Sequence, residues 1–213
     1  MAQRAAAVEG EAPGRRPLLV RLSSQAFLVV YAVALGLALG LGSAHWATSG
    51  EHPPGGVRVG PWTVWPRVGS RDADPYARAV VARSGDIPLG AGEGLALVAS
   101  VDDGDRPLQG NCTYRIGSAT PQARYWTLAV YDAQGRARET ALRRAAFTSA
   151  EMLRDAQGRF SILAGPTVRP GNWLPLPPGR ITFILRLYDT PVAAGSAALD
   201  PRSLPRIERV ECA

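Results

Sequence analysis

The sequence has no lysine, and its 213 residues include only two histidines and two cysteines. Both histidines, His45 and His52, lie beside a long apolar run near the N-terminus. A catalytic triad needs a histidine next to its nucleophile, and a zinc site needs several histidine or cysteine ligands. The C-terminal part of the chain therefore offers no Ser-His-Asp or Cys-His triad, and we expect no metal and no cofactor.

Phosphate-binding glycine loops are missing as well. There is no P-loop, and the glycines at 90–94 do not form a dinucleotide fingerprint after a strand. Hydrolysis by a pair of carboxylates is open in principle, but most of the aspartates occupy turn or cap sequences, where local hydrogen bonds explain them. These aspartates are Asp72, Asp74, Asp86, Asp102, Asp103, Asp105, Asp132 and Asp189. The sequence favours a protein that is not an enzyme.

All 24 basic residues are arginine, and 18 acidic residues leave a formal charge of +6. The arginines are spread from Arg4 to Arg209 without a cluster of five or more. A groove that follows a phosphate backbone needs concentrated charge and stacking aromatics. We therefore expect no nucleic-acid partner.

A long uncharged run stands near the N-terminus. No residue from Leu22 to Gly50 carries a formal charge, and the stretch from Ala26 to Ala44 is almost wholly apolar. Nineteen residues of helix measure about 28 Å, close to a hydrocarbon core of about 30 Å. This pattern predicts a single transmembrane helix over 22–46, with Trp46 at the interface.

The charges around this run predict its orientation. Four arginines and two glutamates precede it, and the first arginine after it is Arg58. The positive-inside rule places residues 1–21 in the cytoplasm and the rest of the chain in the bacterial periplasm, anchored to the inner membrane. A cleavable signal peptide is the alternative, because Gly42 and Ala44 are small residues at a suitable spacing.

Small residues recur every four positions within the predicted span. Stacked on one helix face, they would let a second helix approach closely and pair with the first in the membrane. The alternative is that alanine and glycine are simply abundant here. The residues are Ala32, Gly36, Gly40 and Ala44.

A Pro/Gly tether over 47–56 with nothing to bury separates the span from a domain at 57–213. Asp74 before Pro75 predicts a short helix, with Tyr76, Ala79, Val80 and Arg83 on one face, ending at Gly85. A single helical turn is plausible around Ser149. Alternating runs then predict strands at 94–101, 111–116, 124–131, 159–164, 180–188 and 205–210.

These strands are spaced for an all-β sandwich. Alternation places Trp126, Leu128 and Val130 in the core, together with Ile181, Phe183, Leu185 and Leu187. The intervening residues would form an outer or groove face; they are Tyr125, Thr127, Ala129 and Tyr131 on one strand, and Thr182, Ile184 and Arg186 on the other. The turn sequences that begin at Asp102, Asp132 and Asp155 each include a residue able to take positive φ.

The two cysteines, Cys112 and Cys212, would lie in an oxidising compartment, so we expect a disulfide that closes a loop of about 100 residues and fixes the C-terminus. Two free thiols are the alternative.

One loop suggests a binding face. The proline-stiffened segment 169–179 presents Asn172 and Trp173, and it leads into a strand with Arg186 and Tyr188. A tryptophan and an arginine together can recognise an anionic or sugar ligand. The alternative is structural: Trp173 closes the end of the sandwich, and Asn172 caps the loop backbone.

Two motifs of the chain are specific: the W-T-L-x-V-Y-D-x-x-G strand and turn and the N-W-L-P...L-R-L-Y block. Together with several further stretches, they resemble the bacterial family catalogued as domain of unknown function 1214. The resemblance implies a β-sandwich of jelly-roll type. It also implies a partner, because in larger relatives this domain is the C-terminal half of a soluble fusion with a second family of unknown function. The matching stretches are DPYARA (74–79), DGDRPLQGNCTYRI (103–116), RYWTLAVYDAQGR (124–136), DAQGRFSI (155–162), NWLPLPPGRITFILRLYD (172–189) and LPRIERV (204–210).

This chain departs from the longer relatives in two ways. The block 141–152 lacks their Asn-x-x-Arg-Tyr and Gly-Asp-Arg pattern, and the chain adds a membrane span and two cysteines. It is similar to the short, membrane-anchored branch of the family, so it would be half of a split pair. We therefore expect a non-enzymatic envelope module that assembles with a protein bearing the companion domain. The alternative is a ligand face, or a hydrolase-accessory face, for an anionic or glycan substrate.

Overall fold

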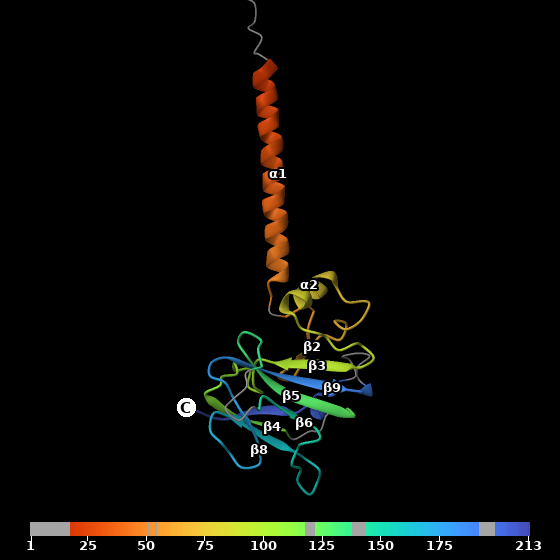
Figure 1. The fold of residues 1–213 in the computed structure, drawn as a ribbon, viewed down its shortest axis with the longest axis vertical. Helices are drawn as coiled ribbons and strands as arrows, with labels where there is room; N and C mark the ends of the chain where they lie inside the picture. Colours follow the sequence, from red (N-terminus) through yellow and green to blue (C-terminus); the bar gives the residue numbers. More distant parts are fainter. Residues whose placement is uncertain (1–17, 51, 54, 118–121, 138–143, 192–198) are drawn as a thin grey trace, which may run out of the picture. The chain divides into compact units, whose positions relative to one another are not determined.

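The computed structural model describes residues 18–50, 52–53, 55–117, 122–137, 144–191 and 199–213. The chain divides into two compact units, Met1–Ser49 and Gly50–Ala213. The first contains the long helix α1 (Leu18–Thr48). The second is mostly β-structure, with one α-helix (Figure 1).

Helix α1 has the length and composition of a membrane-crossing helix. Its segment Ser24–Thr48 has a mean hydropathy of 2.1 over its most apolar window. The predicted span 22–46 lies inside α1, although a signal sequence near an N-terminus has the same features. A Cβ atom added at Gly36 or Gly40 would meet nothing within 4 Å in the described chain, so pairing along the small-residue stripe stays a prediction.

The larger sheet has six strands in the order β1-β2-β3-β9-β5-β6, and all neighbours within it are antiparallel. Its long central strands come from distant parts of the sequence: β9, from the C-terminal part, lies between β3 and β5. The strands are β1 (Val57–Val59), β2 (Trp62–Val64), β3 (Gly94–Ala99), β5 (Tyr125–Asp132), β6 (Ala146–Thr148) and β9 (Ile181–Tyr188).

The smaller sheet has four strands in the order β10-β4-β7-β8. Its neighbours are antiparallel except for β7 and β8, which run parallel although only six residues (166–171) connect them. Parallel neighbours usually need a longer crossover. The strands are β4 (Cys112–Gly117), β7 (Ser161–Gly165), β8 (Asn172–Pro175) and β10 (Arg206–Cys212).

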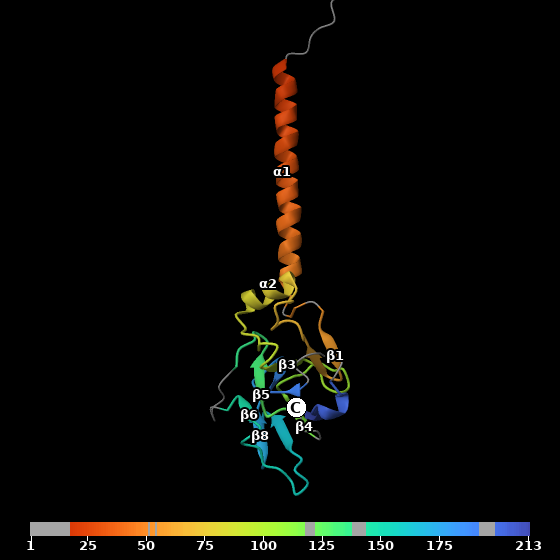
Figure 2. The ribbon, with the colours of Figure 1, turned by 90° about the vertical axis from the view of Figure 1, so that its right-hand side faces the viewer.

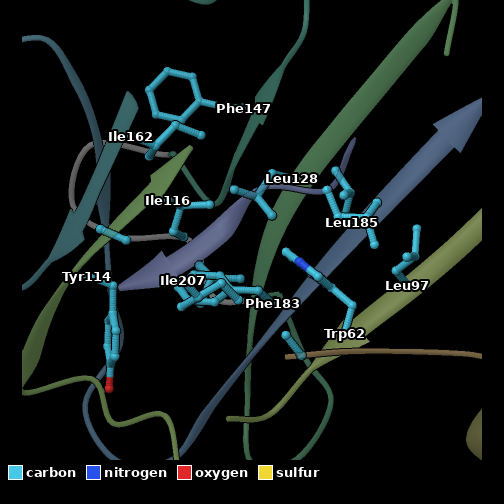
Figure 3. Packing of buried hydrophobic residues seen from close by; sticks show 14 of the residues in the cluster. Trp62, Leu97, Tyr114, Ile116, Leu128, Phe147, Ile162, Phe183, Leu185 and Ile207 are labelled. Carbon is cyan, nitrogen blue, oxygen red and sulfur yellow. The ribbon is translucent and has the colours of Figure 1, made fainter. Parts of the chain in front are cut away.

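The inner faces of the two sheets share one hydrophobic core (Figure 3). Tyr114 of β4 meets Phe183 of β9 edge to face, with ring centroids 6.2 Å apart. The seven core residues predicted on β5 and β9 are all buried, which confirms the alternation. Each large side chain buried in this way contributes about 1.5–3 kcal/mol.

The described part of the second unit contains the short helix α2 (Pro75–Ser84) and the 3₁₀ helix η3 (Pro201–Ser203). Asp74 caps α2 as predicted, because its carboxylate accepts the N–H groups of Tyr76 and Ala77. Of the residues predicted to share one face of α2, Val80 is buried and Tyr76 is 53% exposed; Ala77 is the other buried residue of the helix. Around Ser149 the structure has a turn and no helix.

The end of the predicted tether contacts the domain. The ring of His52 stacks on Trp65, with centroids 5.1 Å apart, and the Trp65 Nε1 donates a hydrogen bond to the Pro53 carbonyl at 2.6 Å. The segment that precedes β1 is therefore held against the indole ring of Trp65. Nothing in the composition of 47–56 indicated this contact, because its partner lies beyond the tether.

The predicted disulfide joins Cys112 and Cys212, which face each other across β4 and β10. Beyond it, Asn111 and Ala213 exchange two hydrogen bonds, of 2.9 and 3.1 Å. In both ribbon views the C-terminus lies close to β4 (Figures 1 and 2). The bridge therefore holds the last strand at the edge of the smaller sheet.

We predict that the double substitution Cys112→Ser and Cys212→Ser lowers the free energy of unfolding by about 3–5 kcal/mol, because the bridge closes a long loop in the unfolded chain. The measurement is urea unfolding of the detergent-solubilised protein, followed by tryptophan fluorescence. Reduction of the wild type should give the same loss, while the double variant should not respond to reductant. Equal stability of the oxidised wild type and the variant would contradict the prediction.

Candidate functional site

Asn172 of the predicted ligand face is used by the backbone. Its side chain accepts the Leu153 N–H at 2.9 Å and donates to the carbonyls of Leu153 and Ser161 at 2.8 and 3.1 Å. The residue is only 7% exposed. Its amide therefore joins strand β8 to the segment that precedes β7, as the structural alternative predicted.

Trp173 points away from the core on β8, because its neighbours Asn172 and Leu174 point inward. It stands beside Leu163 of β7 on the outer face of the smaller sheet. The indole Nε1 is buried and has no hydrogen-bond partner in the described part of the chain.

A pocket of about 300 Å³ is lined by Asn172 and Leu163, whereas Trp173 is not among its lining residues. The Asp155–Arg159 ion pair, 2.9 Å long, lies on its wall. Burial opposes ionisation of Asp155, but hydrogen bonds from Arg159 and Gln157 outweigh it and lower the pKa of that carboxyl. The pocket thus combines a charged pair with apolar walls from Leu153, Leu163 and Pro170.

Arg186 and Tyr188 lie on the outer face of the larger sheet. The Arg186 guanidinium donates to the Tyr131 hydroxyl at 3.1 Å and pairs with Asp86 at 3.8 Å, and its side chain is 20% exposed. Tyr188 contacts the ring of Tyr125, with centroids 5.8 Å apart. Of the predicted ligand face, Trp173 therefore lies on one outer face, Arg186 and Tyr188 lie on the other, and Asn172 points inward.

The outer face around Arg186 forms a surface of its own, which we call the Arg186 face. Ala96 and Thr127 are its register partners on the two neighbouring strands. Arg186 is the one charged residue among the outward positions of β3, β5 and β9. The Arg186 face consists of the exposed Tyr125, the buried Ala129 and eight half-buried residues: Ala96, Val98, Thr127, Tyr131, Thr182, Ile184, Arg186 and Tyr188.

Strand alternation predicted most of this face but missed Asp86. That residue follows α2 in the sequence, and only the tertiary fold brings it to β9. The face carries small side chains beside Arg186 and tyrosines near its ends. Such a surface suits contact with another molecule, since aromatic residues and arginine are enriched at protein interfaces.

The outer face of the smaller sheet is different. Arg115 of β4 pairs with Glu208 of β10 at 3.1 Å, and both side chains are more than half exposed. Charged pairs of this kind are typical of a solvated surface.

Most of the aspartates considered for catalysis have structural partners. Asp102 and Asp132 each accept the backbone N–H groups of the second and fourth residues that follow, and so does Asp155. Each also pairs with an arginine four positions later. In each turn the third residue after the aspartate has positive φ; these residues are Asp105, Gly135 and Gly158, respectively. One turn thus occurs three times, which confirms the prediction from the sequence.

Asp102 is the most buried of these three aspartates, with 1% of its side chain exposed. Burial would raise its pKa, but hydrogen bonds from the Arg106 and Gly104 backbone and the charges of Arg209 and Arg106 outweigh burial and lower it. The contact with Arg209 Nε is 2.8 Å long. This carboxylate therefore joins its own turn to β10.

No group of three or more metal-binding side chains occurs among the residues that the structure describes. Asp103 and Asp105 pair with Arg206 and Arg58, and Asp189 lies 3.7 Å from Arg124.

Residues 93–192 match the family model described as "Protein of unknown function (DUF1214)". This chain carries a DUF1214 domain. The match runs from just before β3 to just after β9, and it confirms the resemblance that the sequence motifs indicated.

Two solved structures are similar. The VPA0106 protein from Vibrio parahaemolyticus matches at 21% identity with a TM-score of 0.53, over 66% of this chain and 36% of that chain. An uncharacterized protein from Burkholderia cenocepacia matches at 19% identity with a TM-score of 0.38, over 69% and 46% of the two chains. No curated protein matches this chain. The Vibrio protein shares the fold of the DUF1214 domain, and this chain spans little more than a third of its length.

We predict that Asn172→Ala lowers the free energy of unfolding by about 3 kcal/mol, because three backbone groups lose a buried partner. Asn111→Ala is the matched control, since that exposed amide makes one hydrogen bond to the C-terminal residue. Urea unfolding of both variants checks this, and equal losses would contradict it.

We also predict that Asp102→Asn lowers the free energy of unfolding by about 3 kcal/mol at neutral pH, because it leaves the half-buried Arg209 without its charge partner. A carboxyl whose pKa is lowered in the folded state stabilises the protein above its unfolded pKa of about 3.9. The gap between wild type and variant should therefore narrow as the pH falls below about 4 and through the folded pKa. Asp155→Asn changes the equivalent aspartate of another copy of this turn, where the side chain is 40% exposed. The difference in the free energy of unfolding between this variant and the wild type should be much smaller. A gap that does not change with pH would contradict the prediction.

Proposed function

We propose that this protein is an inner-membrane anchored module of the bacterial envelope that binds a partner protein. In this proposal residues 1–21 are cytoplasmic, α1 stays in the membrane and the DUF1214 domain lies in the periplasm. The apolar helix and the disulfide support an extracytoplasmic domain. We also propose that its two sheets follow the jelly-roll scheme of the family.

The Arg186 face is the observation that carries the proposal. It is an apolar and aromatic sheet surface with one half-buried cation, whereas the outer face of the smaller sheet holds exposed ion pairs. Interface cores are depleted in charge and enriched in tyrosine and arginine. A partner that offers a carboxylate to Arg186 and an apolar surface to its neighbours would fit this face.

The partner that we propose carries the companion domain of the fused relatives. The Vibrio protein has the same fold in a chain almost three times as long as the matching part. A short chain with a DUF1214 domain could therefore reconstitute a comparable assembly with a separately encoded protein.

A second candidate function is the binding of a small glycan or anionic ligand, alone or as a hydrolase accessory. The observation that favours it is the pocket of about 300 Å³ that Asn172 and Leu163 line, with the Asp155–Arg159 pair on its wall. Hydroxyl groups of a sugar could bind this pair while the ring contacts Leu163.

Affinity capture from mild-detergent membranes tests the partner proposal, using the tagged full-length protein. The wild type should retain one stoichiometric protein with the companion domain, and Arg186→Glu should lose it. A reversed charge in an interface costs several kcal/mol, so we expect binding at least 30-fold weaker. Arg115→Glu, on the other outer face, is the matched control and should keep the partner.

Arg186→Gln serves as a second variant, because it removes the charge without adding a carboxylate beside Asp86. The unfolding temperature of each variant shows whether the fold is intact. A partner kept by both Arg186 variants, or no specific partner for the wild type, would contradict the proposal. In the latter case the pocket that Asn172 and Leu163 line becomes the object of ligand screening.

A further inference from the structure

Three exposed arginines near the start of the second unit have no carboxylate partner. Arg67, Arg71 and Arg78 are exposed, and no acidic side chain in the described chain lies within 4 Å of their guanidinium nitrogens. Asp72 stands in the same loop, is also exposed and makes no ion pair. We call Arg67, Arg71 and Arg78, together with Tyr76, the arginine surface.

Most other arginines in the described chain are ion-paired. Each has a carboxylate within 4 Å, so the free arginines do not simply follow from an arginine-rich composition. The paired residues are Arg58, Arg106, Arg115, Arg124, Arg136, Arg144, Arg159, Arg169, Arg186, Arg202, Arg206 and Arg209.

The local fold holds the three arginines together. One turn joins the Trp65 carbonyl to the N–H of Val68 at 3.1 Å, and a second joins the Arg67 carbonyl to Ser70 at 3.0 Å. The Arg78 guanidinium, in the first turn of α2, donates to the Arg71 carbonyl. Arg67 thus belongs to these turns, Arg71 follows directly after them, and Arg78 joins the helix to the Arg71 backbone.

The two aspartates of this segment neutralise it only in part. The carboxylate of Asp74 is occupied by the N–H groups at the start of α2. Residues 65–84 contain four arginines and two aspartates. The segment therefore keeps a net positive charge on an exposed surface.

The chain also limits how far this segment can lie from the end of α1. Helix α1 ends at Thr48, and His52 already stacks on Trp65. Four residue steps of extended chain span at most about 15 Å. Trp65 begins the turn that carries Arg67, so only a short stretch of chain separates α1 from the residues that contact this turn.

We propose that the arginine surface binds the headgroups of anionic phospholipids in the membrane that α1 crosses. Guanidinium groups form bidentate hydrogen bonds to phosphate, and Tyr76, which is 53% exposed, is of a residue type enriched at the headgroup level. Surface attraction acts over about one Debye length, roughly 8 Å, so the proposal requires the arginine surface to reach the headgroup level. The inference rests on the proposed function, because α1 must stay in the membrane.

Hydrogen exchange of the full-length protein in lipid nanodiscs tests this. One set of discs contains only phosphatidylcholine, and the other contains about 30% phosphatidylglycerol. We expect slower exchange over 65–83 in the anionic discs alone. The triple variant Arg67→Gln, Arg71→Gln and Arg78→Gln should remove this protection, with headgroup affinity about a hundred-fold lower, since each basic residue contributes about a factor of five.

Two further variants sharpen the result. Replacing the same three arginines by lysine keeps the charge and should retain most of the protection. Replacing Arg154, Arg180 and Arg202 by glutamine removes the same charge elsewhere and should leave the protection unchanged. Exchange over 65–83 that is equal in both lipids, or equally affected by the two glutamine triples, would overturn the proposal. Protection that appears only when a partner protein is added would also overturn it.

The same experiment separates this inference from the proposed function. A protein that does not enter the discs, because its helix has been removed, would contradict the proposal that α1 anchors it in the membrane. A protein that enters the discs and shows no lipid-dependent protection leaves the anchor and the partner proposal intact and contradicts only the headgroup contact.

Discussion

The structure of the second unit depends on one core between two sheets. Strand β9 lies in the middle of the larger sheet, and its inward residues pack against those of β4 and β10. Once Phe183 and Leu185 face inward, the period of two forces Ile184 and Arg186 outward. The Arg186 face is thus the consequence of filling the core, and a shift of one residue in register would exchange the two faces.

Short polar contacts hold the edges of this core. The repeated aspartate turn closes three connections with the same hydrogen bonds, and at Asp102 it also reaches Arg209 of the last strand. The disulfide fixes the last residue of that strand to β4. The C-terminal strand is therefore held at its middle and at its end, which suits an edge strand with a single sheet neighbour.

The surface divides into regions of different character. The outer face of the smaller sheet carries ion pairs, the Arg186 face is apolar and aromatic, and the arginine surface near the tether keeps unpaired cations. Net charge does not show this division, because a formal charge of +6 describes only the sum. The partner and headgroup proposals both come from the distribution of the charge.

Local patterns in the sequence determined the apolar helix, the cap at Asp74, the aspartate turns and the inward and outward faces of β5 and β9, because each depends on residues close together in the chain. The pairing of Cys112 with Cys212 needed only the absence of other cysteines. Tertiary structure alone decided that Asn172 and Arg186 lie on different sheets, that Asp86 reaches Arg186 and that His52 packs on Trp65. These contacts depend on which strands become neighbours, and alternation within one strand contains no information about the order of strands in a sheet.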